Sequence, residues 1–381
     1  MSCKALFLIF HGFDNHNVGI SKKIAAQVKA LKQGGLDVGL CYFAIDRHGY
    51  HKRMIDEEVF ENYGKGFFAK VRKRICYSKL TSYLLKQDIR FLYIRSFHNA
   101  NPFLIRMLKK LKNNGIQSVL EIPTFPYDFE YKNVPLSDRP RIFLDRLLRK
   151  SLARYVYRIV TFSNDKLIFG TPTINLSNAI DFDQIRVKSA KPKSANDFRL
   201  IGVAEIHFWH GLDRVITGMA DYYKKPRETK VFFDIVGEGV PEEINRLKTL
   251  VTENMLNEYV AFHGTRTGDE LDLLFEKADM GVASLGRHRS NITSMKSLKN
   301  REYAARGIPF VYSETDDDFE KMPYILKAPA DDSPLDIGEV VAFYYSQNLE
   351  PVKIRNTIID TLSWNVQMRK VIDNCNVTTD E

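Results

Sequence analysis

The chain has 381 residues, 44% hydrophobic and 27% charged, which is the composition of a globular protein with room for two domains of ~150 residues. No run of 18 apolar residues occurs, so no membrane-spanning helix is expected, and four scattered cysteines without a CxxC pair indicate neither a zinc site nor a disulfide framework. The net charge of +9 is uneven, because residues 1–188 hold 32 lysines and arginines against 16 aspartates and glutamates. A basic half is expected to face anionic lipid, nucleic acid or a phosphorylated substrate, unless its charge serves only solubility.

The first half of the chain alternates short apolar runs with amphipathic stretches. Residues 4–10 lack a small-residue cleavage site and are interpreted as a first strand, not a signal peptide. A helix over 21–33 follows, with Ile24, Val28 and Leu31 on one face. Further strands are predicted at 37–43, 90–95, 116–122 and 158–162, and a helix at 102–113. This order predicts a parallel, doubly wound sheet.

The same alternation restarts near residue 198. It predicts strands at 198–203, 231–236, 259–262, 280–283 and 309–312, and helices at 212–222, 241–253, 269–277 and 298–306. We therefore expect Rossmann-like domains over residues 1–186 and 197–350, a linker between them, and a helical segment over 351–381. Two such sheets leave a cleft between the carboxyl ends of their strands, where ligands bind.

Two glycine-containing loops follow predicted strands. The first runs from Gly12 through Asn17 to Gly19 and would let backbone N–H groups approach a ligand, although it is no GxGxxG fingerprint. The second is Gly237-Glu238-Gly239. Either loop is equally well interpreted as a simple crossover turn.

The most informative segment surrounds the helix predicted at 298–306. Lys296, Ser297, Leu298 and Lys299 lie at its N-terminus, and two lysines at a positive helix end make an anion site suited to a diphosphate. Glu302, about one turn further in, could accept hydrogen bonds from ribose hydroxyls, although a glutamate inside a helix is usually only solvated.

This segment resembles a known family. Residues 298–309, LKNREYAARGIP, are similar to the LK-x-x-E-Y-x-A-x-G-x-P form of the glycosyltransferases of family 4, also called glycosyl transferases group 1. Residues 178–181, 203–216 and 233–239 resemble further segments of that family, so the resemblance covers nearly the whole chain. It implies the α/β GT-B fold, two Rossmann-like domains facing across a cleft, with the last helix crossing back to the N-terminal domain.

The resemblance also implies a function. It indicates a hexosyltransferase that transfers a sugar, with retention, from a UDP- or GDP-sugar to a glycan or lipid-linked glycan. Residues 121–127 resemble members that assemble bacterial capsular and surface polysaccharides. The donor would bind the C-terminal domain, with base and ribose near Gly237, Gly239 and Glu302 and the diphosphate at the 298–306 helix. The acceptor would bind near residues 12–19, and His98 would face the donor sugar unless it is only a polar loop residue.

The sequence departs from the family pattern at three positions. Glu205 and His210 stand where the family has arginine and lysine, and Ser294 stands at the first glutamate of E-x7-E, which contacts the donor sugar. Positive charge for the diphosphate is then expected from Lys299 first, and from Lys296, Arg287 and Arg289. No metal or other cofactor is expected, because Asp316–Asp318, although similar to a DxD metal motif, is interpreted as a solvated loop and helix cap.

Residues 65–86 and 139–158 mix arginines and lysines with large apolar residues. This pattern is typical of a helix on an anionic membrane, and equally of a helix whose apolar face lies in the core. We expect a cytoplasmic protein, with peripheral contact at the inner membrane face as one alternative. Rival functions are a nucleotide-sugar 2-epimerase of the same fold, a non-catalytic sugar-binding scaffold, and a basic nucleic-acid-binding protein, although no nucleic-acid module is visible.

Overall fold

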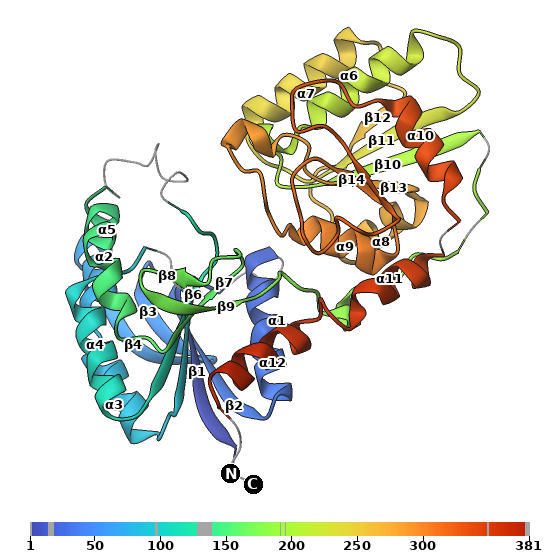
Figure 1. Cartoon of the computed structure of the whole chain (residues 1–381). Coiled ribbons are helices and arrows are strands. Elements are labelled where there is room, and N and C mark those ends of the chain that lie inside the picture. Colours follow the sequence, from blue (N-terminus) through green and yellow to red (C-terminus); the bar gives the residue numbers. More distant parts are fainter. Residues whose placement is uncertain are drawn as a thin grey trace. The chain divides into compact units, whose positions relative to one another are not determined.

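The computed structural model describes residues 2–13, 19–95, 98–127, 139–190, 192–194, 196–348 and 350–377. The chain divides into two compact units, unit 1 with residues 1–177 and 364–381, and unit 2 with residues 178–363. Both are α/β units built around a sheet (Figure 1).

Unit 1 is built on a nine-stranded sheet of order β4-β3-β2-β1-β5-β6-β7-β9-β8. Its strands are β1 Cys3–Gly12, β2 Leu36–Ile45, β3 His51–Ile55, β4 Glu58–Gly64, β5 Phe91–Arg95, β6 Gln117–Ile122, β7 Arg158–Thr161, β8 Leu167–Ile168 and β9 Thr171–Asn175. Its helices are α1 Gly19–Gln33, α2 Gly66–Ile75, α3 Ser78–Lys86, α4 Pro102–Asn113, α5 Arg139–Ala153 and α12 Trp364–Asn374. Helices α1 and α12 lie on one side of the sheet and α2 to α5 on the other (Figure 1).

Unit 2 has a six-stranded sheet of order β12-β11-β10-β13-β14-β15, in which every pairing is parallel. Its strands are β10 Asp197–Val203, β11 Lys230–Val236, β12 Val260–Phe262, β13 Met280–Val282, β14 Phe310–Tyr312 and β15 Ile325–Lys327. Its helices are α6 Leu212–Tyr223, α7 Pro241–Glu253, α8 Gly268–Lys277, α9 Leu298–Arg306, α10 Ile337–Ser346 and α11 Pro351–Ile359, with short 3-10 turns η1 Phe182–Gln184, η2 Phe208–His210 and η3 Arg287–Ser290. Strand order reverses between β10 and β13, which is the switch point where ligands of such sheets bind.

Two features differ from the sequence predictions. The sheet of unit 1 is not wholly parallel, because β3 and β4 form an antiparallel hairpin with β2 and the short β8 pairs antiparallel with β9. Their connections are too short for a parallel crossover. The segment predicted as helical over 351–381 forms two helices, α11 and α12, and between them Ser363 makes a parallel bridge to Ile180.

Candidate functional site

The carboxyl ends of β10, β13 and β14 lie next to one another in unit 2, because β13 pairs in parallel with both other strands. Three loops leave this edge: residues 204–211 after β10, 283–297 after β13 and 313–319 after β14. Of the predicted donor-side residues, Glu205, His210, Lys296 and Ser297 lie in these loops, while Leu298 and Lys299 begin α9. The structure therefore brings these predicted residues to one edge of the sheet.

The loop after β10 packs closely against the loop after β13. Gly211 ends η2 with φ 65°, and a Cβ at this position would lie 2.7 Å from the carbonyl carbon of Leu285, so the approach requires glycine. The amide of Leu285 donates to the carbonyl of His210 at 2.9 Å. His210 also accepts, at Nδ1, a hydrogen bond of 3.2 Å from the amide of His207. His210 is thus held through its ring by the amide of His207 and through its backbone carbonyl by the amide of Leu285.

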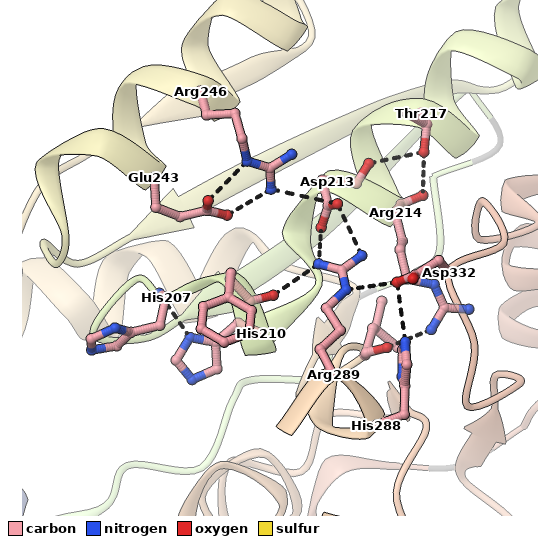
Figure 2. A network of polar contacts seen from close by, with 12 residues as sticks. His207, His210, Asp213, Arg214, Thr217, Glu243, Arg246, His288, Arg289 and Asp332 are labelled. Atoms are coloured by element: carbon pink, nitrogen blue, oxygen red, sulfur yellow. Dashed lines mark hydrogen bonds and ion pairs between the residues drawn. The ribbon is translucent and has the colours of Figure 1, made fainter. Parts of the chain in front are cut away.

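A network of ion pairs fixes the same two loops (Figure 2). The guanidinium of Arg289 donates to both carboxylate oxygens of Asp213 at 3.0 Å and to Asp332 at 2.7 Å. It also donates to the carbonyl of Phe208 at 2.8 Å, while Arg246 lies 3.5 Å from the Asp213 carboxylate. Bidentate pairs of this kind fix orientation as well as distance. The charge of Arg289, one of the cations expected to face a diphosphate, is therefore shared between two carboxylates.

Arg214, in the first turn of α6, is a further brace that the sequence did not indicate. Its side chain is 1% exposed and donates to the carbonyls of Leu285, Pro329 at 3.0 Å and Ser333 at 2.7 Å. Such an arginine inside an amphipathic helix carries no sequence signal, because its partners are backbone carbonyls of distant loops.

The N-terminus of α9 is anchored by a buried ion pair. Arg301 is fully buried, binds the carboxylates of Asp316 and Asp318, and donates to the carbonyls of Asn178 at 2.8 Å and Ser297 at 3.0 Å. Ser297 occupies the N-cap position, but its side chain makes no capping hydrogen bond. The interpretation of the Asp316 segment as a solvated loop is wrong for Asp316 itself, which is buried against Arg301 because its charge needs a partner there.

Four titratable groups meet beside this helix end. Burial, with the charge of Arg287, lowers the pKa of Lys299 to about 7. Burial also lowers the pKa of His210 well below its ordinary value, and the charges of Lys299 and Arg287 add to this effect. Burial raises the pKa of Glu314 to about 7, although Arg287 and Lys299 favour its charged form. The edge thus combines the charge of Arg287 and a partly protonated Lys299 with a partly ionised Glu314, beside a neutral histidine.

The predicted base and ribose contacts are engaged within unit 2. A Cβ at Gly237, φ 127°, would lie 1.8 Å from the carbonyl oxygen of Ala204, and one at Gly239 would lie 2.1 Å from that of Ile206. Glu238 lies between these glycines, and its carbonyl accepts from the amide of Ile206 at 2.8 Å. Close loop packing therefore explains both glycines.

Two predicted glutamates differ in environment. The carboxylate of Glu302 accepts from Arg306 at 3.1 Å, and Arg306 also pairs with Asp272 at 2.7 Å. The side chain of Glu205 is 81% exposed and lies 3.4 Å from His207. Lys296 offers its carbonyl to the side-chain amide of Asn178 at 2.7 Å.

The predicted residues of unit 1 lie near the carboxyl ends of its central strands. Gly12 ends β1 and Gly19 begins α1, whereas Asn17 lies outside the described residues. His98, φ 51°, is buried with its Nδ1 3.7 Å from the carboxylate of Asp145, and its ring meets that of Tyr127 edge-on.

Beside Phe13, unit 1 has a hollow of about 600 Å³, lined by residues of α1, β2 and the β3–β4 turn. The lining residues are Phe13, Ala25, Val28, Lys29, Lys32, Gln33, Leu40, Tyr42, Asp56 and Glu57. The hollow thus combines two aromatic rings with charges of both signs.

Within the described ranges, no three His, Cys, Asp or Glu side chains are grouped as metal ligands. The described helices include none that is long and apolar enough to cross a bilayer.

Solved structures share this architecture. The similar structures include a sucrose-phosphate synthase from Thermosynechococcus elongatus, with TM-score 0.69 and 14% identity over 99% of this chain and 98% of that chain. Anabaena HepE, solved in complex with UDP, has TM-score 0.60 and 13% identity over 98% of this chain and 100% of that chain. The catalytic domain of Arabidopsis thaliana starch synthase IV, bound to ADP and acarbose, has TM-score 0.62 and 12% identity over 100% of both chains. The chain has the GT-B fold. At these identities the likeness establishes the fold alone, and no protein-family model and no curated protein matches the sequence.

Proposed function

We propose that the chain is a glycosyltransferase whose nucleotide-diphosphate-sugar donor binds the carboxyl edge of unit 2. The observation that carries this proposal is the meeting of Lys299 and Arg287 at the N-terminus of α9, beside the switch point of the sheet. A helix N-terminus with two cations suits a diphosphate. The GT-B fold supports the proposal, since HepE and starch synthase IV were solved with UDP and with ADP.

In this proposal the leaving diphosphate is stabilised by fixed charge from the protein. Bond cleavage at the anomeric carbon leaves negative charge on the diphosphate oxygens, and Lys299, Arg287 and the backbone N–H groups of α9 would oppose it. The braces around Arg289 and Arg301 hold these groups in place before the donor arrives. Because the charge comes from side chains and a helix end, we propose that transfer needs no metal.

The proposal is tested by a binding screen followed by an activity assay. UDP, GDP and ADP and their sugars are screened for thermal stabilisation, and transfer or slow hydrolysis of the donor is then measured with and without chelator. We expect one nucleotide to stabilise the wild type, and Lys299→Met to abolish that shift. Lys225→Met is the matched control, because Lys225 is exposed beyond the C-terminal end of α6. A wild type that no nucleotide stabilises contradicts the proposal.

For the donor nucleoside, we propose that base and ribose lie near residues 237–239, with Glu302 released from Arg306 to accept the ribose hydroxyls. Arg306 retains Asp272 as a partner, so this exchange leaves no buried charge alone. Glu302→Gln should weaken the binding of the nucleoside diphosphate more than the binding of inorganic pyrophosphate, because only the nucleoside diphosphate carries the ribose. Equal weakening of the two would contradict this assignment.

We propose that unit 1 binds a glycan or lipid-linked glycan near Gly12–Gly19. The adjacent hollow offers Phe13 and Tyr42 as aromatic surfaces for sugar rings, with Lys29 and Lys32 beside them. His98 is our candidate for contact with the donor sugar, and His98→Ala is expected to lower kcat. We propose that transfer retains the anomeric configuration, which proton NMR of the first product anomer tests. We also propose that the reaction serves the synthesis of a bacterial surface polysaccharide.

We further propose that unit 1 contacts the inner face of an anionic membrane. Phe67 and Phe68 on α2 are each 74% exposed, and Phe143 and Leu147 on α5 are 70% and 66% exposed. Lysines and arginines flank them on both helices, which favours anionic headgroups. Co-sedimentation with phosphatidylglycerol vesicles, but not phosphatidylcholine vesicles, is expected, and Phe67→Ser/Phe68→Ser should reduce it. Equal binding of wild type and variant would contradict the assignment.

A further inference from the structure

Glu314 is a buried carboxyl group to which no other described residue donates a hydrogen bond. It is 2% exposed, and neither of its side-chain oxygens bonds to any other described residue. Buried carboxylates are normally paired, because removing one from water without a partner is costly. Apart from the backbone of Glu314 itself, the described part of the chain therefore supplies no hydrogen-bond donor to this carboxyl group.

A second unsatisfied group lies at the same edge. The hydroxyl of Ser284 is fully buried and has no hydrogen-bond partner among the described residues. Ser284 and Glu314 each follow a strand by two residues, β13 and β14, and these strands are adjacent. The amide of Ser313 donates to the carbonyl of Ser284 at 3.0 Å, so the two loops run together.

The surrounding charges restrict what could satisfy this pair. Arg287 and Lys299 interact electrostatically with Glu314, so a cationic ligand is disfavoured. A phosphate is attracted by the two cations, but the carboxylate repels it. Hydroxyl groups are neutral and can donate to the carboxylate oxygens while accepting from the Ser284 hydroxyl. A polyhydroxylated group covalently attached to a phosphate satisfies both halves of the cluster at once.

We propose that Glu314 and Ser284 form the subsite for the glycosyl group of the nucleotide-sugar, with the carboxyl group of Glu314 hydrogen-bonding the sugar hydroxyls. This inference rests on the proposed donor site at Lys299 and Arg287 and assigns its sugar end. Burial raises the pKa of Glu314 to about 7, so near neutral pH the group can both accept from and donate to hydroxyls. The buried orphan groups thereby gain the partners that the protein itself does not supply.

The test compares a nucleoside diphosphate with its sugar conjugate. Dissociation constants are measured for UDP and UDP-glucose, ADP and ADP-glucose, and GDP and GDP-mannose, in wild type, Glu314→Ala, Glu314→Gln and Ser284→Ala. For the sugar nucleotide that stabilises the wild type, we expect Glu314→Ala to raise the dissociation constant on the order of 10- to 100-fold. The free diphosphate should bind unchanged or more tightly, because a negative charge beside the cations is removed. Glu314→Gln, which keeps volume and hydrogen-bonding capacity, should give a smaller loss and serves if the alanine variant fails to fold.

Distinct outcomes separate the failures. Equal weakening of the diphosphate and its sugar conjugate, or equal tightening of both, overturns the glycosyl subsite while leaving the donor site intact. A wild type that binds none of the six ligands overturns the donor site itself, and the subsite with it. Glu339→Gln is the charge-matched control, since Glu339 is exposed on α10, and it should change neither constant.

Discussion

The affinity of unit 2 for a nucleoside diphosphate should fall as pH rises above 7, mainly through Lys299. Burial, with the charge of Arg287, lowers the pKa of Lys299 from 10.5 to about 7. A bound diphosphate favours the charged ammonium and so raises this pKa in the complex, which means that binding takes up a proton whenever the pH exceeds about 7. Glu314 acts in the same direction, because the bound anion raises the pKa of its carboxyl group further above about 7.

The magnitude follows from the fraction of Lys299 that is protonated. With a pKa of about 7, the side chain is about three-quarters protonated at pH 6.5 and about 3% protonated at pH 8.5. Binding that requires the ammonium form therefore weakens about 25-fold, or about 2 kcal/mol, over this range. At pH 6.5, Lys299→Met removes a charge-assisted hydrogen bond worth about 1.5–3 kcal/mol, which is a loss of about 10- to 150-fold.

Isothermal titration calorimetry measures both quantities. UDP, or the nucleoside diphosphate found in the screen, is titrated at pH 6.5, 7.5 and 8.5 in two buffers of different ionisation enthalpy, which counts the protons taken up. Lys299→Arg is the matched control, because arginine stays charged throughout and should give a shallower pH dependence. A wild-type affinity that is constant or rises with pH would refute this account, as would a Lys299→Met variant that binds UDP at pH 6.5 like the wild type.

Three further predictions concern stability. Arg301→Met leaves the buried Asp316 carboxylate unpaired and should cost about 3–5 kcal/mol in urea unfolding of unit 2, and a loss below about 1 kcal/mol would contradict the buried ion pair. Gly237→Ala should destabilise more than Gly170→Ala in thermal melts, because both have positive φ but only the former Cβ would strike backbone, whereas equal effects would show that the loop relaxes freely. Burial opposes ionisation of Glu121, but Arg95 and neighbouring groups lower the pKa of its carboxyl group. The ionised Glu121 therefore stabilises the folded protein above about pH 4.3, the ordinary pKa of a glutamate, and this stabilisation is lost as the pH falls through the lower pKa of the folded state. Glu121→Gln should abolish this part of the acid dependence measured by urea titration, and an unchanged profile would exclude it.

Much of the secondary structure was accessible from local signals. The helices at 102–113, 241–253 and 298–306 coincide with α4, α7 and α9, because proline or polar residues mark their starts and the apolar spacing is regular. The strand β3 was not predicted because its buried positions include the polar His51 and Arg53, which give no apolar alternation. The edge strands β4 and β15 were missed because they are partly exposed and carry a weak apolar pattern.

Sequence reasoning proposed the members of the candidate cluster that lie at the start of α9, and the family resemblance pointed to His210 and Arg287 as well. Lys299 was proposed from the charge at the start of α9, which is a local pattern. Glu314 and Ser284 were missed, although each follows a strand by two residues, because nothing in their neighbourhood distinguishes them from ordinary polar loop residues. Their interest arises from burial without a partner, which exists only once β13 and β14 are paired. Arg289 was predicted to face the diphosphate of the donor. Its ion pairs with Asp213 and Asp332 could not be predicted, because these residues are distant from it in the sequence.

The unusual His210 becomes consistent with an anion site once the cluster is considered as a whole. A lysine at this position would stand beside Lys299 and Arg287, and each added cation in a half-buried cluster lowers the pKa of the others. Here His210 is neutral, so Arg287 and a partly protonated Lys299 supply the positive charge, and Glu314 offsets part of it. The free edge is then only weakly positive. A bound diphosphate raises the pKa values of Lys299 and Glu314, so both groups take up protons from solution. The net charge of Arg287, Lys299, Glu314 and His210 together then rises to about +2. The edge would thus reach its full positive charge only with the donor in place, which limits the electrostatic cost of the unliganded protein.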